Sequence, residues 1–219
     1  MEILRYLMLA VFLVSAGIHL YASLKNDKPL RNKTKPFILT GLLGFYCCAA
    51  KPVVLFAVLA LAFSWLGDLL LIPKGNKWFT AGGIAFMVSH VFFILTYLRQ
   101  TELGSIRPAV IAGLILFFVT ASLVFFKYLR PHLPKALFYP MLAYLILNGL
   151  MNCFAWFRCL TLRNTAGLVT AAGALLFFLS DSSLFLVRFH KNSPLKTHFW
   201  VMLTYSLGEF LIVLGLIMG

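Results

Sequence analysis

Charged residues, and acidic ones above all, are scarce in this chain of 219 residues. Asp, Glu, Lys and Arg together make up 11% of it, whereas a soluble domain has about 25%. Hydrophobic residues make up 62%, against about 45–50% in a soluble domain, and the mean hydropathy is +0.94. This composition excludes an ordinary soluble fold and indicates a membrane protein.

The motifs of several large enzyme classes are missing as well. The chain contains no G-x-S-x-G, no H-E-x-x-H and no P-loop, so nothing supports a serine hydrolase, a zinc protease or an NTPase. Its four cysteines form no C-x-x-C pair, and no histidine lies near them at metal-ligand spacing. We therefore expect neither a metal site nor a disulfide framework.

The charges that are present are mostly positive, with 19 Lys and Arg against six Asp and Glu and a net charge of +13. They lie in short loops between apolar runs, and no basic cluster is interleaved with aromatic residues. We therefore expect membrane lipids, and not nucleic acid, to be the partner of these charges.

Long apolar runs fill most of the sequence. They lie at about residues 3–22, 35–50, 52–72, 78–98, 108–127, 136–156, 164–187 and 197–218. Continuous runs near 20 residues are typical of spanning helices, whereas barrel strands alternate. We predict an all-α fold, a single integral membrane domain over residues 1–219 with eight transmembrane helices. The first run is too long for a signal peptide, and Pro36 and Pro52 are expected at helix starts.

The loop charges predict the orientation of this bundle. Thirteen of the 19 basic residues fall on the side opposite the N-terminus: Lys25, Lys28, Arg31, Lys33, Lys35, Lys74, Lys77, Lys127, Arg130, Lys135, Arg188, Lys191 and Lys196. The positive-inside rule makes that side cytoplasmic and leaves both termini outside the cytoplasm. We expect a multi-pass protein of a bacterial inner or cell membrane.

Two segments of the chain show a weak internal similarity. Gly67-Asp68-Leu69-Leu70-Leu71 in the third run resembles Ser180-Asp181-Ser182-Ser183-Leu184 in the seventh. Two parallel repeats of a four-helix unit would place these segments in corresponding positions. Chance explains the match equally well, so both interpretations stay open.

A few ionisable side chains lie inside apolar runs, where each costs a few kcal/mol or more. They are Asp68, Asp181, Glu209, His19 and His90. Asp68 and Asp181 both lie near the cytoplasmic ends of their runs. A neutral and an ionised carboxyl together can serve as a general acid and a charge stabiliser. Such a pair suits hydrolysis through an oxocarbenium-like cation.

Three functions are compatible with these residues. An enzyme predicts that Asp68, Asp181 and His90 converge in a blind cavity. A small proton-coupled transporter predicts a path that reaches both membrane faces. A non-catalytic lipid-binding protein predicts that each polar group pairs with a neighbouring helix and that there is no cavity.

Four elements of the sequence resemble the YhhN-type lysoplasmalogenase family. They are Lys35-Pro36, Ser64-Trp65-Leu66-Gly67-Asp68, Phe79-x-x-Gly82-Gly83 running to Ser89-His90, and Tyr205-x-x-Gly208-Glu209-Phe210-Leu211-Ile212. The resemblance extends over almost the whole chain. It implies a membrane hydrolase that cleaves the vinyl ether bond of lysoplasmalogen, a lysophospholipid. The products would be a fatty aldehyde and glycerophosphoethanolamine or glycerophosphocholine, and no metal or organic cofactor is implied.

The resemblance also implies that Asp68 and Asp181 form the catalytic pair. We hypothesise that Asp68 donates the proton, that Asp181 stabilises the cation and orients water, and that His90 positions the pair or relays a proton. The expected substrate-binding residues are Lys35, Ser64, Tyr205, Glu209 and Asn148. Lys35 and neighbouring cations such as Arg188 would hold the lipid phosphate. The sequence indicates no oligomeric state.

Overall fold

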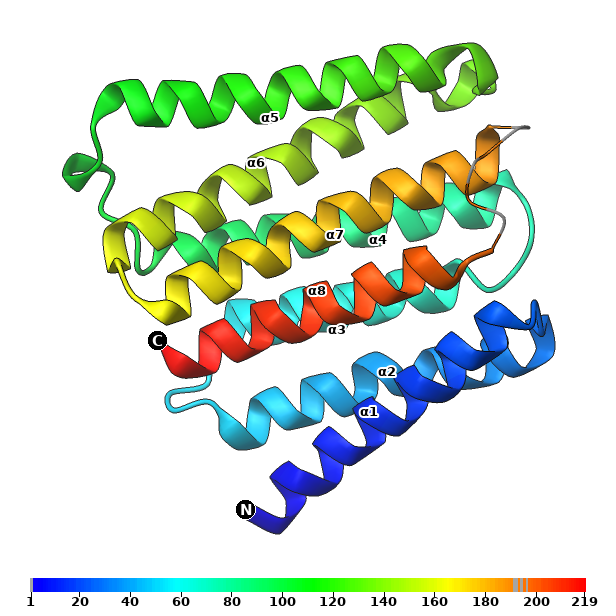
Figure 1. Cartoon of the computed structure of the whole chain (residues 1–219), viewed down its shortest axis with the longest axis horizontal. Helices are drawn as coiled ribbons and strands as arrows, with labels where there is room; N and C mark the ends of the chain where they lie inside the picture. Colours follow the sequence, from blue (N-terminus) through cyan, green and yellow to red (C-terminus); the bar gives the residue numbers. More distant parts are fainter. Residues whose placement is uncertain (1, 191–192, 194, 196) are drawn as a thin grey trace.

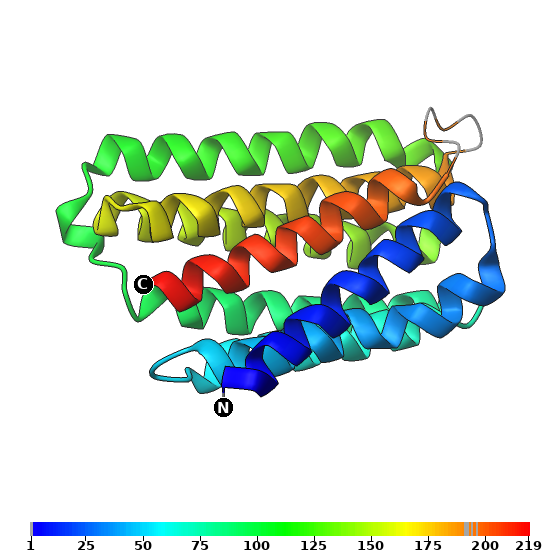
Figure 2. The same ribbon diagram turned by 60° about the horizontal axis from the view of Figure 1, so that its bottom comes forward.

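The computed structural model describes residues 2–190, 193, 195 and 197–219. Within these residues the chain is all-α, as predicted, with eight α-helices and no strand. They are α1 (Glu2–Leu24), α2 (Lys28–Ala49), α3 (Leu55–Leu70), α4 (Asn76–Leu98), α5 (Pro108–Leu129), α6 (Phe138–Leu162), α7 (Thr165–Phe189) and α8 (Phe199–Met218). Three single-turn 3-10 helices, η1 (Leu103–Ser105), η2 (Arg130–His132) and η3 (Lys135–Leu137), lie on either side of α5. The helices run back and forth between the two ends of the bundle and are tilted to one another, α1 most clearly (Figures 1 and 2).

Six of the described helices are long and apolar enough to cross a membrane: α1, α4, α5, α6, α7 and α8. The chain is therefore an integral membrane protein. The other two helices, α2 and α3, do not meet this criterion of length and apolarity, each for a different reason. α3 has 16 residues, fewer than the roughly 20 that span a bilayer, and the first turns of α2 carry Lys28, Arg31, Lys33 and Lys35.

The start of α2 corrects a sequence-based prediction. Asp27 caps the helix by accepting a hydrogen bond from the Leu30 N–H (3.0 Å), and Pro29 lies in the first turn. Pro36, which we predicted to open the helix, lies inside it instead. The prediction for Pro52 was also wrong, because Pro52 lies in the connection before α3. Hydropathy marks where a run becomes apolar, whereas the cap marks where the helix begins.

The connections between helices divide into two sets, one at each end of the bundle (Figures 1 and 2). One end holds both termini and the α2–α3, α4–α5 and α6–α7 connections. The opposite end holds the α1–α2, α3–α4 and α5–α6 connections, together with the end of α7 and the start of α8. This division agrees with the sides assigned from the sequence. Lys191 and Lys196, two of the basic residues assigned to the opposite end, lie outside the described residues.

Glycines allow two helix pairs to approach closely. A Cβ atom on Gly173 of α7 would lie 2.6 Å from the backbone nitrogen of Ile212, and one on Gly208 would lie 2.9 Å from the Gly173 carbonyl. A Cβ atom on Gly41 of α2 would lie 2.5 Å from the backbone nitrogen of Phe12 in α1. Small residues of this kind let helices pack in lipid, where the hydrophobic effect drives no association. These contacts hold α8 against α7 and α2 against α1.

Candidate active site

Asp68 lies near the end of α3 and is buried, with 2% of its surface exposed. Its Oδ1 atom is 3.1 Å from the Nζ atom of Lys35 on α2, and its Oδ2 atom accepts a hydrogen bond from the Tyr205 hydroxyl on α8 (2.9 Å). A buried carboxylate is stable only where such partners replace water. Three helices therefore converge on this side chain.

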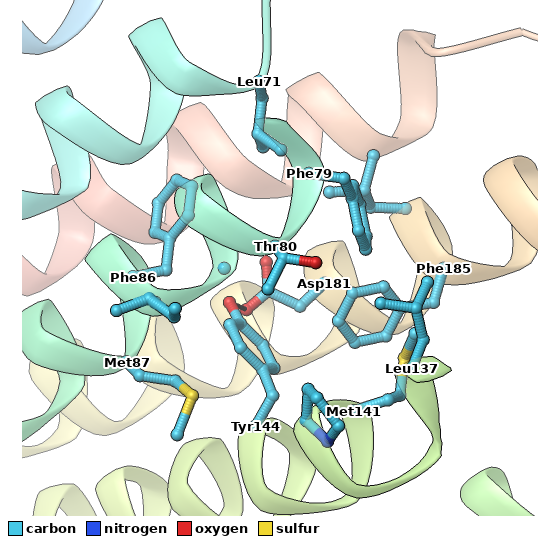
Figure 3. Close-up of a pocket in the computed structure, with 14 residues that line it drawn as sticks. Leu71, Phe79, Thr80, Phe86, Met87, Leu137, Met141, Tyr144, Asp181 and Phe185 are labelled. Carbon is cyan, nitrogen blue, oxygen red and sulfur yellow. Dashed lines mark hydrogen bonds between the residues drawn. The ribbon is translucent and has the colours of Figure 1, made fainter. Parts of the chain in front are cut away.

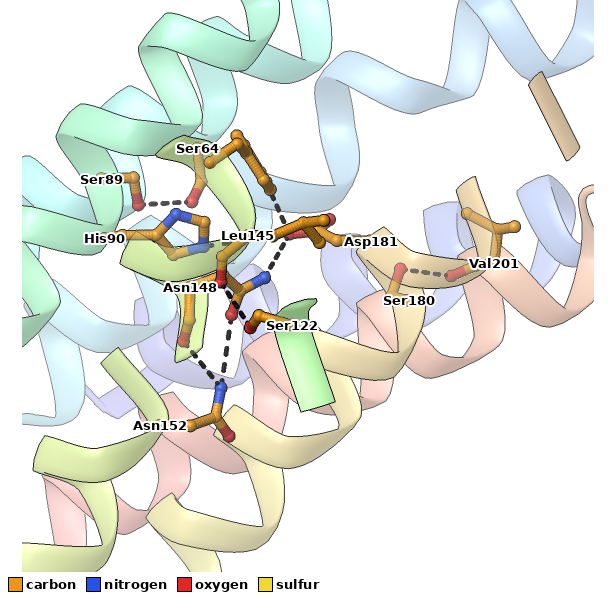
Figure 4. Close-up of polar contacts among 11 residues, drawn as sticks. Ser64, Ser89, His90, Ser122, Leu145, Asn148, Asn152, Ser180, Asp181 and Val201 are labelled. Carbon is orange, nitrogen blue, oxygen red and sulfur yellow. Dashed lines mark hydrogen bonds and ion pairs between the residues drawn. The ribbon is translucent and has the colours of Figure 1, made fainter. Parts of the chain in front are cut away.

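Asp181, on α7, is held by a different set of groups. Its Oδ2 atom accepts hydrogen bonds from the Tyr144 hydroxyl (2.5 Å) and from Nδ2 of Asn148 (2.7 Å), both on α6. Asn152, one turn further along α6, donates to the Asn148 side chain (3.3 Å) and continues the network (Figure 4). Among the described residues, no Lys or Arg forms an ion pair with Asp181.

His90 lies beside Asp181 in the middle of α4. Its Nε2 atom is 3.9 Å from Asp181 Oδ2, and its ring makes edge contacts with the rings of Tyr144 and Phe177. Neither ring nitrogen has a hydrogen-bond partner among the described residues. His90 is thus placed against the Asp181 carboxyl without being committed to another partner (Figure 4).

Both aspartates line one cavity of about 350 Å³, toward the end of the bundle opposite the termini. We call it the polar cavity. Its lining comes from α1, α2, α3, α4, α7 and α8, together with adjoining loop residues. It includes His19, Arg31, Asn32, Lys35, Asp68, Phe79, Phe86, Ser180, Asp181, Leu184, Arg188, His198 and Tyr205. Arg31, Lys35 and Arg188 bring three positive charges, and Asp68 and Asp181 are the acids in this lining.

His198, which precedes α8, adds no charge to this cavity at neutral pH. Burial, together with the positive charges of Arg31, Lys35 and Lys28, lowers the pKa of its imidazole to about 4. The positive potential of the cavity therefore comes from the two arginines and Lys35.

Arg188 lies in the last turn of α7 and is oriented by contacts with α4. Its guanidinium carbon is 4.1 Å from the centre of the Phe79 ring, and its Nη2 atom donates to the Gly75 carbonyl (3.3 Å). These contacts hold the guanidinium in the lining of the polar cavity, where an anionic group could bind it.

A second cavity of about 50 Å³ adjoins the polar cavity between α4, α6 and α7 (Figure 3). We call it the apolar cavity. Its lining is Leu71, Phe79, Thr80, Gly83, Ile84, Phe86, Met87, Leu137, Pro140, Met141, Tyr144, Asp181, Leu184 and Phe185. Asp181 lines both cavities, so its carboxyl lies where they meet.

The residues that the sequence singled out are distributed unequally around this site. Lys35 and Tyr205 line the polar cavity with the two aspartates. The other three expected substrate-binding residues, Ser64, Asn148 and Glu209, are fully buried and are not part of that lining. Asn148 holds Asp181, and Ser64 pairs with the Ser89 hydroxyl (2.8 Å; Figure 4). The Glu209 carboxyl has no hydrogen-bond partner among the described residues.

Sequence reasoning gave no site role to Tyr144, Arg31 or His198. Each carried a signal in its spacing: Tyr144 is one helical turn from Asn148, Arg31 is one turn from Lys35, and His198 is two turns from Tyr205. His198 lies just before α8 and reaches the polar cavity from there.

Similarity to known proteins bears on the function of this site. The sequence model of the YhhN family matches residues 30–216, which include Lys35, Asp68, Asp181 and Tyr205. The mouse (Mus musculus) protein named lysoplasmalogenase TMEM86B is 34% identical to this chain over 158 residues, which are 71% of this chain and 61% of that protein. The chain thus aligns with less than two thirds of that relative's length. No solved structure matches.

Proposed function

The chain belongs to the YhhN family, and from this premise we propose that it hydrolyses the vinyl ether bond of lysoplasmalogen. The products would be a fatty aldehyde and glycerophosphoethanolamine or glycerophosphocholine. One observation carries the proposal: two buried aspartates, held by different partners, line one cavity together with three cationic side chains. The name of the mouse relative supports the same reaction.

The reaction consumes one water molecule and proceeds in three stages. A proton adds to the β-carbon of the vinyl group and leaves an oxocarbenium ion. Water then attacks the carbon bonded to the ether oxygen and loses a proton, which gives a hemiacetal. The hemiacetal breaks its bond to the glycerol oxygen, which takes up a proton as the aldehyde forms. The site must therefore supply an acid, a group that stabilises the cation, and a base for the water.

The contacts of the two aspartates favour a division of roles opposite to our sequence-based hypothesis. Asp68 is engaged as the anionic partner of Lys35, which suits it to stabilise the cation and to orient water. Among the residues that the structure describes, the hydrogen-bond partners of Asp181 are the neutral Tyr144 and Asn148, both on its Oδ2 atom, so Oδ1 is free to carry a proton. We therefore assign the acid to Asp181. His90, 3.9 Å away, would position that carboxyl or relay its proton.

Recognition of the head group follows from the cationic side chains. Arg31, Lys35 and Arg188 would bind the lipid phosphate in the polar cavity. Tyr205 and Asn148 would act by holding the two carboxyls in place.

We extend the proposal to the arrangement in the membrane. All eight helices would span it, with the polar cavity toward the cytoplasm and both termini on the other side, in a bacterial inner membrane or its equivalent. The excess of basic residues at the end opposite the termini supports this orientation. Two parallel four-helix repeats would relate α3 to α7, and the convergence of Asp68 and Asp181 on one cavity supports that relation.

A transporter would need a passage to both faces. A third cavity of about 210 Å³ lies near the opposite end, lined by Tyr46, Lys51, Pro52, Val54, Thr96, Arg99, Gln100, Leu216, Ile217 and Gly219. Among the described residues, none lines both this cavity and the polar cavity. This separation favours a blind site over a transport path.

The test is aldehyde release by the purified protein in detergent. Lysoplasmenyl-ethanolamine is the substrate, and the same lysolipid with a saturated ether or an ester bond is the control. We expect aldehyde from the vinyl ether alone. Folded wild-type protein that releases no aldehyde would refute the proposal and turn attention to transport assays.

A further inference from the structure

The apolar cavity has no role in the reaction described above. We propose that it holds the first carbons of the substrate's hydrocarbon chain, and that the chain continues from there into the bilayer between α4 and α6. This inference rests on the proposed function and deepens it, because it divides one substrate between two cavities.

The shared wall of the two cavities is the first argument. Leu71, Phe79, Phe86, Asp181 and Leu184 line both of them, and Asp181 is the one polar side chain in this set. All three cations of the site line only the polar cavity. A lipid with its phosphate at these cations and its chain in the apolar cavity would therefore have the junction between head group and chain at Asp181. In lysoplasmalogen, that junction is the vinyl ether.

The outer rim of the apolar cavity is the second argument. Ile84 of α4 is 56% exposed and Pro140 of α6 is also exposed, although both line the cavity. Both residues lie in helices that are long and apolar enough to cross the membrane, where their exposed surface would face lipid. The cavity thus opens sideways, between α4 and α6, toward the hydrocarbon of the bilayer.

The volumes fit a divided substrate. A pocket for a whole drug-sized ligand has roughly 300–1,000 Å³. The polar cavity, at about 350 Å³, is within this range, whereas the apolar cavity, at about 50 Å³, has room for only a short stretch of hydrocarbon. The rest of a long chain must therefore lie outside, and the lateral opening leads it into lipid. The fatty aldehyde would leave by the same route.

Gly83 of α4 allows a direct test. A Cβ atom at Gly83 would meet no other atom within 4 Å, so Gly83→Phe places its ring in the apolar cavity without forcing the backbone apart. Gly113 of α5 is the matched control, because a Cβ atom there also meets nothing within 4 Å and the residue lines neither cavity.

Gly83→Phe should lower kcat/KM for a long-chain lysoplasmalogen by about tenfold or more, since each methylene that loses its burial weakens binding about fourfold. A soluble analogue whose alkenyl group ends after the vinyl carbons should be affected far less. Gly113→Phe should behave as wild type with both substrates. Equal losses with the long and the short substrate, or no loss with either, would overturn the inference.

A labelling experiment keeps this inference separate from the proposed function. The probe is a lysophosphocholine with a saturated ether bond and a diazirine near the ether end of its chain. We expect label on residues 80–87 and 137–144, less label in Gly83→Phe, and no change in Gly113→Phe. Label confined to α2 and α8 would overturn the inference even if the protein releases aldehyde. Label on α4 and α6 without any aldehyde release would refute the hydrolase and retain the chain site.

Discussion

Replacing Asp181 with asparagine tests the assigned acid with little change in shape. The Oδ2 atom of Asp181 accepts hydrogen bonds from Tyr144 (2.5 Å) and Asn148 (2.7 Å), and the oxygen of an asparagine side chain can accept the same two. Because the acid form of Asp181 carries its proton on Oδ1 and is neutral, asparagine keeps both bonds without the loss of a charge, and the free energy of unfolding should change by less than about 1 kcal/mol. The amide has no proton to give the β-carbon. General acid–base catalysis contributes about 10²–10⁴-fold, so kcat should fall by that factor, or about 3–5 kcal/mol in activation free energy.

The assay follows aldehyde release from lysoplasmenyl-ethanolamine by wild type, Asp181→Asn and the control Asp27→Asn. Asp27 caps α2 and lines neither cavity, and asparagine is an equally good cap, so the control should keep wild-type activity. Thermal unfolding in the same detergent verifies that each variant is folded. If folded Asp181→Asn keeps more than about a tenth of the wild-type rate, a loss below the range expected for acid catalysis, Asp181 is not the acid.

Three other predictions concern the site and the packing around it. Lys35→Met should abolish turnover and destabilise the fold by about 3 kcal/mol, because it leaves Asp68 as a buried carboxylate without its ion pair. The double variant with Asp68→Asn should recover most of the lost free energy of unfolding, measured by chemical denaturation, but none of the activity. The stability of the wild type should fall as the pH is lowered from about 6.5 to about 4, because His198 takes up a proton near pH 6.5 in the unfolded chain but only near pH 4 in the folded one. The Tm of His198→Gln should drop less than that of the wild type over the same pH range. Gly173→Leu would collide with the backbone of Ile212, so it should reduce the folded fraction in size-exclusion chromatography, whereas a folded, fully active variant would show that α7 and α8 need no close contact.

Much of the fold could be predicted from hydropathy, because an apolar run in lipid has no alternative to a helix except a closed barrel. The start of α2 could not. Its first turns carry Lys28, Arg31 and Lys35, and their helical state depends on the Asp27 cap and on Pro29 in the first turn. The number of spans could not be predicted from hydropathy either, because the packing of the bundle, and not the transfer free energy, specifies a helix that is short or charged.

The site residues could be predicted where burying an ionisable side chain in an apolar run costs free energy. Asp68 and Asp181 were found because a carboxyl inside an apolar run requires an explanation. Lys35, Tyr205 and Asn148 were also expected at the site, but as substrate-binding residues and not as partners of the aspartates, because a contact between two helices depends on how the helices pack. Ser64 illustrates the limit: it shares a helix face with Asp68, yet its hydroxyl bonds Ser89 on α4. Spacing along one helix defines a face, but only packing decides what that face meets.

The geometry of the two cavities bears on the choice between hydrolysis and transport. A carrier needs two aqueous openings on opposite faces for the same solute. A hydrolase acting on a lysolipid needs two exits of different chemistry, since one product is soluble and the other is a lipid. The polar cavity carries Arg31, Lys35 and Arg188, whereas the apolar cavity opens beside Ile84 toward lipid. The glycerophospho product would leave past the cations and the aldehyde between α4 and α6. Asp181 lies where these two routes divide, which is where the bond that joins the two products must break.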